Sequence, residues 1–126
     1  YLLRNESQKG LGFFEANNFY PDFILWIVEG DRQYVTFIDP KGIRNLKGLE
    51  DSKVQLFRYL QNEVARQMGN PNLILNSFII SNTPKEQVDF WTQKPFATEE
   101  FAKNHVLFEE TEGAYLDQMM RMILNP

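Results

Sequence analysis

The chain of 126 residues contains no cysteine, which excludes disulfide bonds and thiolate metal sites and is compatible with a reducing cytoplasm. Its longest apolar run is far shorter than the roughly 20 residues that a membrane-spanning helix needs. No signal peptide is recognisable. We therefore expect a cytoplasmic location and no membrane partner. A GxxxxGK[ST] loop is also missing, which excludes an ATPase motor of that type within this chain.

What the chain does contain is the composition of a folded domain, with 43% hydrophobic and 14% aromatic residues. This length fits one domain with a modest core, so we interpret residues 1–126 as a single domain. Because the chain starts at Tyr1 rather than Met, we interpret it as a piece of a larger protein. The net charge of −4 argues mildly against a non-specific nucleic-acid binder, which normally has a basic surface.

The stretch from residue 19 to residue 41 predicts a β-hairpin. Two runs rich in β-branched and aromatic residues, 23–28 and 33–38, predict antiparallel strands. The residues between them, Glu29-Gly30-Asp31-Arg32, predict a tight turn, because glycine and aspartate tolerate the positive φ that two-residue turns require.

Polar residues stand at the open end of this hairpin. Pro21-Asp22 precedes the first strand and Asp39-Pro40-Lys41 follows the second, so we expect Asp22 and Asp39 to lie close together. Side chains alternate along a strand, so Asp39 and Lys41 project the same way if the backbone stays extended through Pro40. Because proline has no N–H, we also expect the strand to stop or bulge there. The alternative interpretation is that both elements are ordinary turn sequences.

Two carboxylates and an ammonium at one sheet edge suit metal-assisted cleavage of phosphodiester bonds. Mg²⁺ prefers hard oxygen ligands, typically one or two carboxylates completed by waters and substrate phosphate. We expect Asp22, Asp39 and the carbonyl oxygen of Pro40 to hold Mg²⁺, with Mn²⁺ as a substitute. Lys41 would position or deprotonate the attacking water, or stabilise charge on the phosphate.

These elements, Pro21-Asp22 and Asp39-Pro40-Lys41, resemble the PD-(D/E)xK nuclease signature. The longer segments 18–26 and 37–42 are similar to the C-terminal nuclease domain of type III restriction-like DEAD/DEAH helicases. The resemblance implies a restriction-endonuclease-like fold and Mg²⁺-dependent deoxyribonuclease activity. It also implies two partners, DNA and the helicase/ATPase motor region of a parent protein.

Residues 55–59, QLFRY, are similar to the QxxxY element of one nuclease branch, which adds Gln55 to the catalytic candidates. The residues leave a second interpretation open, because Ser52 and Gln55 also have the spacing of a helix capping box. Tyr59 is more often a packed helix aromatic. The superfamily usually supplies a further acid from a helix ahead of the first strand, and here only Glu6 and Glu15 stand upstream.

Periodicity predicts an α/β domain with the order β-β-β-α-β and a mixed sheet. Residues 1–10 indicate a strand remnant or an ordered tail. We expect a first strand at 10–14 and a main helix from Ser52 to Gly69. Leu73 to Ile80 should form a strand parallel to 33–39, because a helical crossover joins the two. The expected buried stripe of the main helix consists of Val54, Phe57, Leu60, Val64 and Met68.

The remaining chain predicts short elements. A helix should start at 83–86 and end near Trp91, Thr98 should cap one more turn, and 105–108 should form a strand. The final helix, 113–124, has an apolar face made of Leu116, Met119, Met120 and Ile123. The single histidine, His105, can act as a general base, but a structural role is the favoured interpretation. Three basic side chains either contact a phosphate backbone or are simply solvated: Lys53, Arg58 and Arg66.

Two other functions stay open. The first is a nuclease-fold module that binds nucleic acid without cleaving it, which the missing upstream acid favours. The second is an interaction or oligomerisation domain that uses the methionine-rich C-terminal helix, because methionine packs adaptably against partners. The sequence leaves the oligomeric state open.

Overall fold

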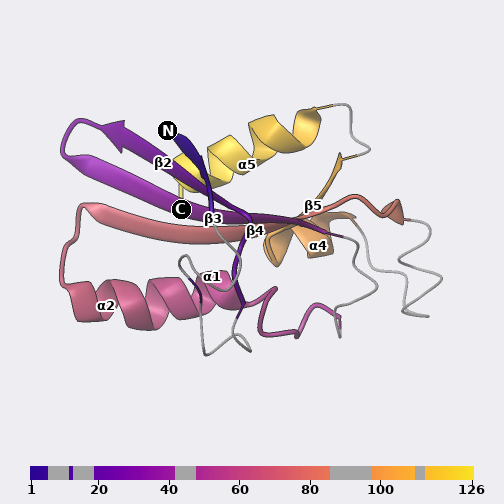
Figure 1. The fold of residues 1–126 in the computed structure, drawn as a ribbon, viewed down its shortest axis with the longest axis horizontal. Helices are drawn as coiled ribbons and strands as arrows, with labels where there is room; N and C mark the ends of the chain where they lie inside the picture. The colour runs from indigo at the N-terminus through magenta and orange to yellow at the C-terminus, as the bar shows by residue number, and fades with distance from the viewer. Residues whose placement is uncertain (6–11, 13–18, 42–47, 86–97, 110–112) are drawn as a thin grey trace.

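The computed structural model describes residues 1–5, 12, 19–41, 48–85, 98–109 and 113–126, with Lys41 described by its backbone. Its centre is a five-stranded sheet in the order β1-β2-β3-β4-β5 (Figure 1). The strands are β1 (Leu2–Arg4), β2 (Phe23–Glu29), β3 (Arg32–Lys41), β4 (Leu73–Ser81) and β5 (Val106–Phe108). The pairs β1–β2 and β2–β3 are antiparallel, and the pairs β3–β4 and β4–β5 are parallel.

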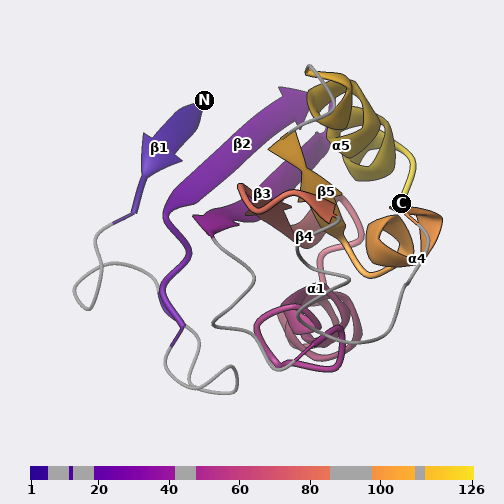
Figure 2. The same cartoon turned by 90° about the vertical axis from the view of Figure 1, so that its right-hand side faces the viewer.

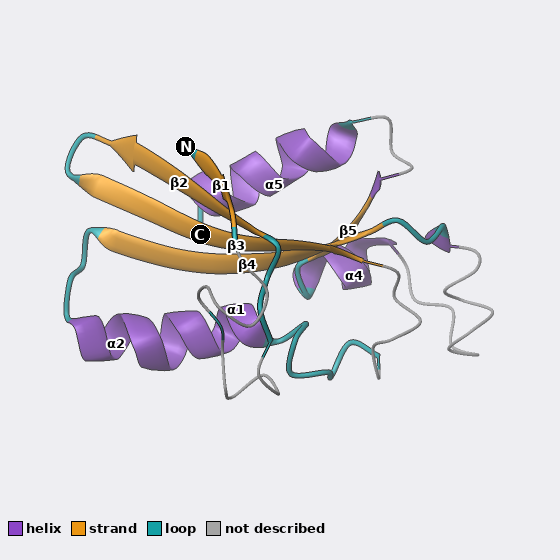
Figure 3. Cartoon of the chain, in the orientation of Figure 1, coloured by secondary structure: helices purple, strands orange, loops and turns teal. Residues whose placement is uncertain are grey.

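Helices flank this sheet on both sides. The connection from β3 to β4 is one helix made of three segments, α1 (Leu56–Tyr59), the π-helical η3 (Leu60–Val64) and α2 (Ala65–Met68). It lies on one face, whereas α5 (Ala114–Leu124) lies on the other (Figure 3). A short helix, α4 (Thr98–Lys103), precedes β5. The predicted α/β class with a mixed sheet is confirmed, and no helix within the described ranges is long and apolar enough to cross a membrane.

The predicted hairpin is present and forms the antiparallel half of the sheet. The β2–β3 register runs from Phe23↔Ile38 to Glu29↔Arg32. In its two-residue turn Gly30 has a φ of 60°, which glycine adopts at no steric cost. Asp31 does not share the positive φ, so one left-handed residue is enough to reverse the chain.

The predicted crossover is also confirmed. β4 pairs in parallel with β3 from Gln33↔Leu73 to Lys41↔Ser81. The helix between them ends at Gly69, whose φ of 63° gives the left-handed C-cap that glycine favours.

The expected first strand at 10–14 falls largely outside the described residues, and the strand interpretation of residues 1–10 holds for Leu2–Arg4. The strand that pairs with β2 is Leu2–Arg4, whose backbone aligns Leu2 with Leu25 and Leu3 with Ile24. Gly12 lies outside any strand, and the other residues of 10–14 lie outside the described ranges. Glycine is depleted in strands, which agrees with the position of Gly12 outside any strand. Figure 2 shows β1 at the edge of the sheet remote from α4 and α5.

The prediction for the helix that starts at 83–86 falls largely outside the described residues. Lys85 is helical, and 86–91 are not described. The later elements agree better with the sequence. α4 begins at Thr98, as predicted, and continues to Lys103, while the predicted strand at 105–108 is β5 without its first residue.

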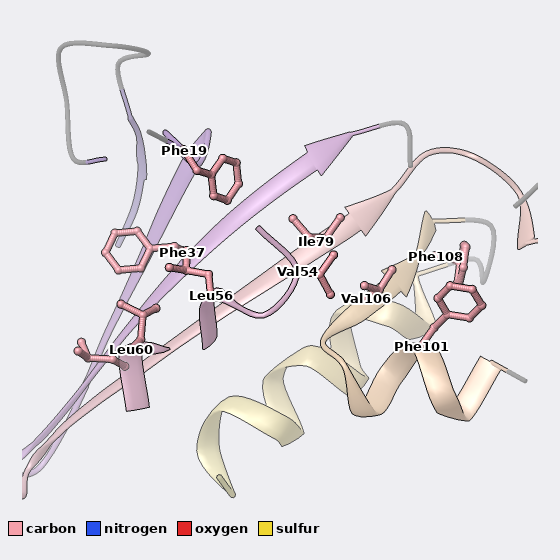
Figure 4. Close-up of a cluster of buried hydrophobic side chains, with 10 residues drawn as sticks. Phe19, Phe37, Val54, Leu56, Leu60, Ile79, Phe101, Val106 and Phe108 are labelled. Carbon is pink, nitrogen blue, oxygen red and sulfur yellow. The ribbon is translucent and has the colours of Figure 1, made fainter. Parts of the chain in front are cut away.

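Two hydrophobic clusters fill the faces of the sheet. The α1-face cluster lies between α1, the strands and α4 (Figure 4), and it includes Phe19, Phe37, Val54, Leu56, Leu60, Ile79 and Phe101. The α5-face cluster lies under α5 and includes Tyr34, Ile38, Phe78, Ile80, Met119 and Ile123.

Two predicted core positions are wrong. Met68 is 57% exposed and Leu116 is 48% exposed. Leu56, which the predicted stripe omitted, is buried instead.

Candidate functional site

Asp22 and Asp39 lie side by side at the open end of the hairpin. Asp22 directly precedes Phe23 and Asp39 directly follows Ile38, and Phe23↔Ile38 is the last pair of the hairpin register. The backbone N–H of Asp22 donates a hydrogen bond to Oδ1 of Asp39 at 3.0 Å. The hairpin therefore brings the backbone of Asp22 within hydrogen-bond distance of the Asp39 carboxylate, although the two residues are 17 positions apart in the chain. Their predicted proximity is present in the structure, and their metal-binding role stays a prediction.

The two carboxylates differ in access. Asp39 is only 4% exposed, whereas Asp22 is half-buried. Alternation along β3 places Asp39 on the same face as Phe37, which belongs to the α1-face cluster. Burial of an ionised carboxylate is costly unless hydrogen bonds or a cation compensate it. The pair thus extends from the interior to the surface, as a cation site reached from solvent requires.

Pro40 does not interrupt the strand, so the prediction of a stop or bulge is wrong. β3 continues through Pro40 and Lys41, which align with Ile80 and Ser81 of β4. The register with β2 already ends at Ile38, so β3 has a single neighbouring strand at this point, and proline is tolerated at such edge positions. The backbone therefore stays extended through Pro40, which is the condition under which Asp39 and Lys41 were predicted to project the same way. The Pro40 carbonyl as a metal ligand stays a prediction.

The capping box predicted for Ser52 and Gln55 does not form. The helix begins at Leu56 with Gln55 as its N-cap, and no side chain caps it. Instead, Asp51 organises the preceding turn, because its Oδ1 accepts the Lys53 N–H at 2.9 Å and its carbonyl oxygen accepts the Gln55 N–H at 2.9 Å. A carboxylate that bonds the backbone two residues on competes with the helical geometry a capping box needs.

The side chain of Gln55 has a structural function. Its Nε2 donates both hydrogens, to the carbonyl oxygen of Leu49 at 2.6 Å and to Oδ1 of Asn104 at 2.8 Å. Its Oε1 accepts no hydrogen bond from the described residues, so a contribution of Gln55 to catalysis is restricted to that oxygen. The companion residue of the QxxxY element, Tyr59, is half-buried against the α1-face cluster, which agrees with a packed helix aromatic.

Asn104 is a residue of this region that the sequence did not identify. It follows α4, receives the Gln55 hydrogen bond, and donates through Nδ2 to the carbonyl oxygen of Glu100 at 2.9 Å. It therefore joins the end of α4 to the start of α1. An asparagine just after a helix usually indicates no more than a C-terminal cap, so its link to Gln55 has no signal in the sequence.

His105 is held in an aromatic stack. Its ring lies between Phe57 and Phe78, with centroid distances of 3.7 and 4.5 Å, and its Nδ1 lies 3.0 Å from the carbonyl oxygen of Ser77. Because a carbonyl oxygen only accepts, we assign the proton to Nδ1. Burial lowers the pKa of His105 to about 4. The hydrogen bond to the Ser77 carbonyl oxygen raises this pKa in part, and the positive charge of Arg58 lowers it. A neutral, stacked imidazole supports the structural interpretation.

The donor set at the open end fits Mg²⁺ as far as the described residues go. Two adjacent carboxylates are a sufficient protein contribution when waters and a substrate phosphate complete the octahedron. Within the described part of the chain, no group of three or more Asp, Glu, His or Cys side chains gathers around a point. The upstream candidates Glu6 and Glu15 lie outside the described residues.

Comparison with protein-family models, with curated proteins and with solved structures gives no match. A function for the chain therefore has to be argued from its own residues.

Proposed function

We propose that this chain is a metal-dependent nuclease domain that hydrolyses DNA phosphodiester bonds. The observation that carries the proposal is the hydrogen bond from the Asp22 N–H to Asp39 Oδ1, directly before Pro40-Lys41 in the same strand. With it we propose a restriction-endonuclease-like fold and a role as the cleavage module of a restriction-type helicase.

Each residue has a specific task in this proposal. Asp22 and Asp39 hold Mg²⁺, which supplies positive charge for the scissile phosphate and lowers the pKa of a bound water. Lys41 orients or deprotonates the attacking water. The water oxygen then forms a bond to phosphorus while the bond from phosphorus to one ester oxygen breaks. The carbonyl oxygen of Pro40 and Oε1 of Gln55 are the remaining acceptors that we assign to this site.

The position of the carboxylates in the fold supports the proposal. Asp39 stands at the carboxyl end of β3, which is parallel to β4 and β5. In α/β proteins, ligands bind in the crevice outside the carboxyl ends of parallel strands. The loops that leave those ends surround a ligand without disturbing the sheet beneath it.

One alternative has specific support. A nuclease-fold module that binds DNA without cutting it is favoured because the described residues contain no third acid at the site, and because the Gln55 amide nitrogen is already bonded to Leu49 and Asn104. The oligomerisation alternative is weakened, because Met119 and Ile123 of α5 lie in the α5-face cluster rather than on the surface.

The decisive experiment combines Mg²⁺ and Mn²⁺ titration calorimetry with cleavage assays on single- and double-stranded DNA. The informative variant is Asp39→Asn, which keeps an oxygen for the Asp22 N–H and removes the charge. Its matched control is Asp31→Asn, in the exposed turn at the other end of the hairpin. We expect the wild type and Asp31→Asn to bind metal and cleave DNA, and Asp39→Asn to do neither while melting at a similar temperature.

Two results would contradict the proposal. Metal binding and cleavage that survive in Asp39→Asn would remove Asp39 from the site. DNA binding that is indifferent to Mg²⁺, with no cleavage by the wild type, would favour the non-cleaving module instead.

A further inference from the structure

Lys53 is held near the segment that carries Asp22. Its Nζ lies 5.7 Å from the centroid of the Phe19 ring. Phe19 belongs to the α1-face cluster and precedes Asp22 by three positions. The ammonium therefore lies beside the chain segment whose other end, at Asp22, donates to Asp39.

Hydrogen bonds fix the turn from which Lys53 extends. The Lys53 N–H donates to Oδ1 of Asp51, and Gln55, two positions on, is tied to Leu49 and Asn104. The Lys53 side chain is half-buried and makes no ion pair within the described residues. An aromatic face attracts a cation without occupying any of its three N–H donors in a directional bond, so those donors stay available.

We propose, on the basis of the function proposed above, that Lys53 binds a phosphate of the DNA strand next to the Asp22–Asp39 pair. Two carboxylates repel a phosphodiester, and the chain as a whole has a net charge of −4. A cation that already lies over Phe19, three positions before Asp22, offsets this repulsion and loses little conformational freedom on binding. Lys53 is thus a positioning residue for the substrate backbone.

The basic side chains of the helix that follows this turn provide the comparison. Arg58 is exposed and lies over the ring of Phe57, with 5.2 Å between its Cζ and the ring centroid. Arg66 is exposed on α2, and roughly 15 Å of helix separate it from Gln55 at 1.5 Å per residue. Because the helix runs from the carboxyl end of β3 towards the start of β4, Arg66 lies at the opposite end of the sheet from Asp39. It is the matched control.

The test measures DNA binding by fluorescence anisotropy over a range of NaCl concentrations, with Ca²⁺ in place of Mg²⁺ to suppress cleavage. For Lys53→Met we expect affinity about tenfold weaker near 50 mM salt and a salt slope smaller by about 0.9, as for the loss of one phosphate contact on duplex DNA. Lys53→Arg should restore most of the affinity. Arg66→Met should bind like the wild type.

The readouts separate this inference from the proposed function. Mg²⁺ affinity by calorimetry should be unchanged in Lys53→Met, and its melting temperature should match that of Arg66→Met. If Lys53→Met keeps both the affinity and the salt slope of the wild type, while Asp39→Asn loses metal binding and cleavage, the role of Lys53 is overturned and the nuclease proposal stands. If the wild type binds neither metal nor DNA, both are overturned.

Discussion

On the α1 face of the sheet, the buried carboxylate of Asp39 and the half-buried amide nitrogen of Gln55 have hydrogen-bond partners, whereas on the α5 face two buried polar atoms have none. Those two atoms are Thr36 Oγ1 and Asn76 Nδ2, which lack a partner among the described residues. Thr36 and Asn76 are register partners across β3 and β4, and each is 1% exposed.

The difference lies in where each polar group stands along its strand. Asp39 is at the carboxyl end of β3, where a ligand can approach, but Thr36 and Asn76 lie mid-strand beneath α5. An unsatisfied buried polar atom costs on the order of 1–3 kcal/mol. We therefore interpret the α1 face as the functional face. The polar pair on the α5 face is a cost to stability that has no access to a ligand.

The largest expected effect is on the functional face. Lys41→Met should lower the rate of DNA cleavage by about a thousandfold, since general acid–base and electrostatic groups each contribute about that much. Mg²⁺ affinity should persist, because the carboxylates remain. Steady-state kinetics and calorimetry measure both quantities, and Lys103→Met on α4 is the control. Cleavage at the wild-type rate would exclude Lys41 from the chemistry.

The next effect is on the α5 face and concerns stability without function. Ile123 is fully buried at 0% exposure, so Ile123→Ala should lower the free energy of unfolding by about 3 kcal/mol. Leu116→Ala, on the same helix but half exposed, should cost much less. Urea denaturation gives both values. A folded Ile123→Ala variant that loses metal affinity would show that the two faces are not independent.

The pH dependence of stability tests His105, which packs against both faces. Its pKa is lowered by burial from the ordinary histidine value of 6.5 to about 4 in the folded state, so the unfolded chain binds a proton more readily. The contribution of neutral His105 is complete above pH 6.5 and is lost as the pH falls towards 4. Between about pH 7 and about pH 4.5 we expect a loss of about 2 kcal/mol from this residue.

His105→Phe is the control for that titration, because it retains an aromatic ring and removes the ionisable group. Urea denaturation at a series of pH values should show a flatter profile for this variant than for the wild type, whatever its absolute stability. Parallel profiles would mean that another group is responsible for the acid sensitivity.

The smallest effect tests the unsatisfied pair. Thr36→Val replaces a buried hydroxyl by a methyl group of similar size and should raise the free energy of unfolding by about 1 kcal/mol. Asn76→Leu should do the opposite, because Asn76 Oδ1 accepts the Ser77 N–H at 2.9 Å and that donor would lose its partner. Thermal denaturation compares the two variants. A destabilised Thr36→Val would indicate that the hydroxyl has a partner, such as an internal water.

Much of the fold follows from local patterns. The hairpin, the helix end at Gly69 and the parallel strand β4 were predictable, because turn chemistry, glycine conformation and β-branched runs act over a few residues. The proximity of Asp22 and Asp39 was predictable for the same reason, since a tight turn fixes the register along the whole hairpin. The edge strand Leu2–Arg4 was predictable only as a strand remnant or ordered tail within residues 1–10, because three residues contain too little periodicity to define a strand.

The sequence by itself thus determined the hairpin and which carboxylates meet at its open end. Only the tertiary structure decided that Asp39 is the buried aspartate of the two and that β3 continues through Pro40. It also decided that the side chain of Gln55 bonds to Asn104, 49 positions away, instead of to its own helix. It also placed Lys53 over Phe19. The physical reason is that hydrogen bonds and ring contacts between distant segments depend on how the helices pack on the sheet, which no local pattern encodes.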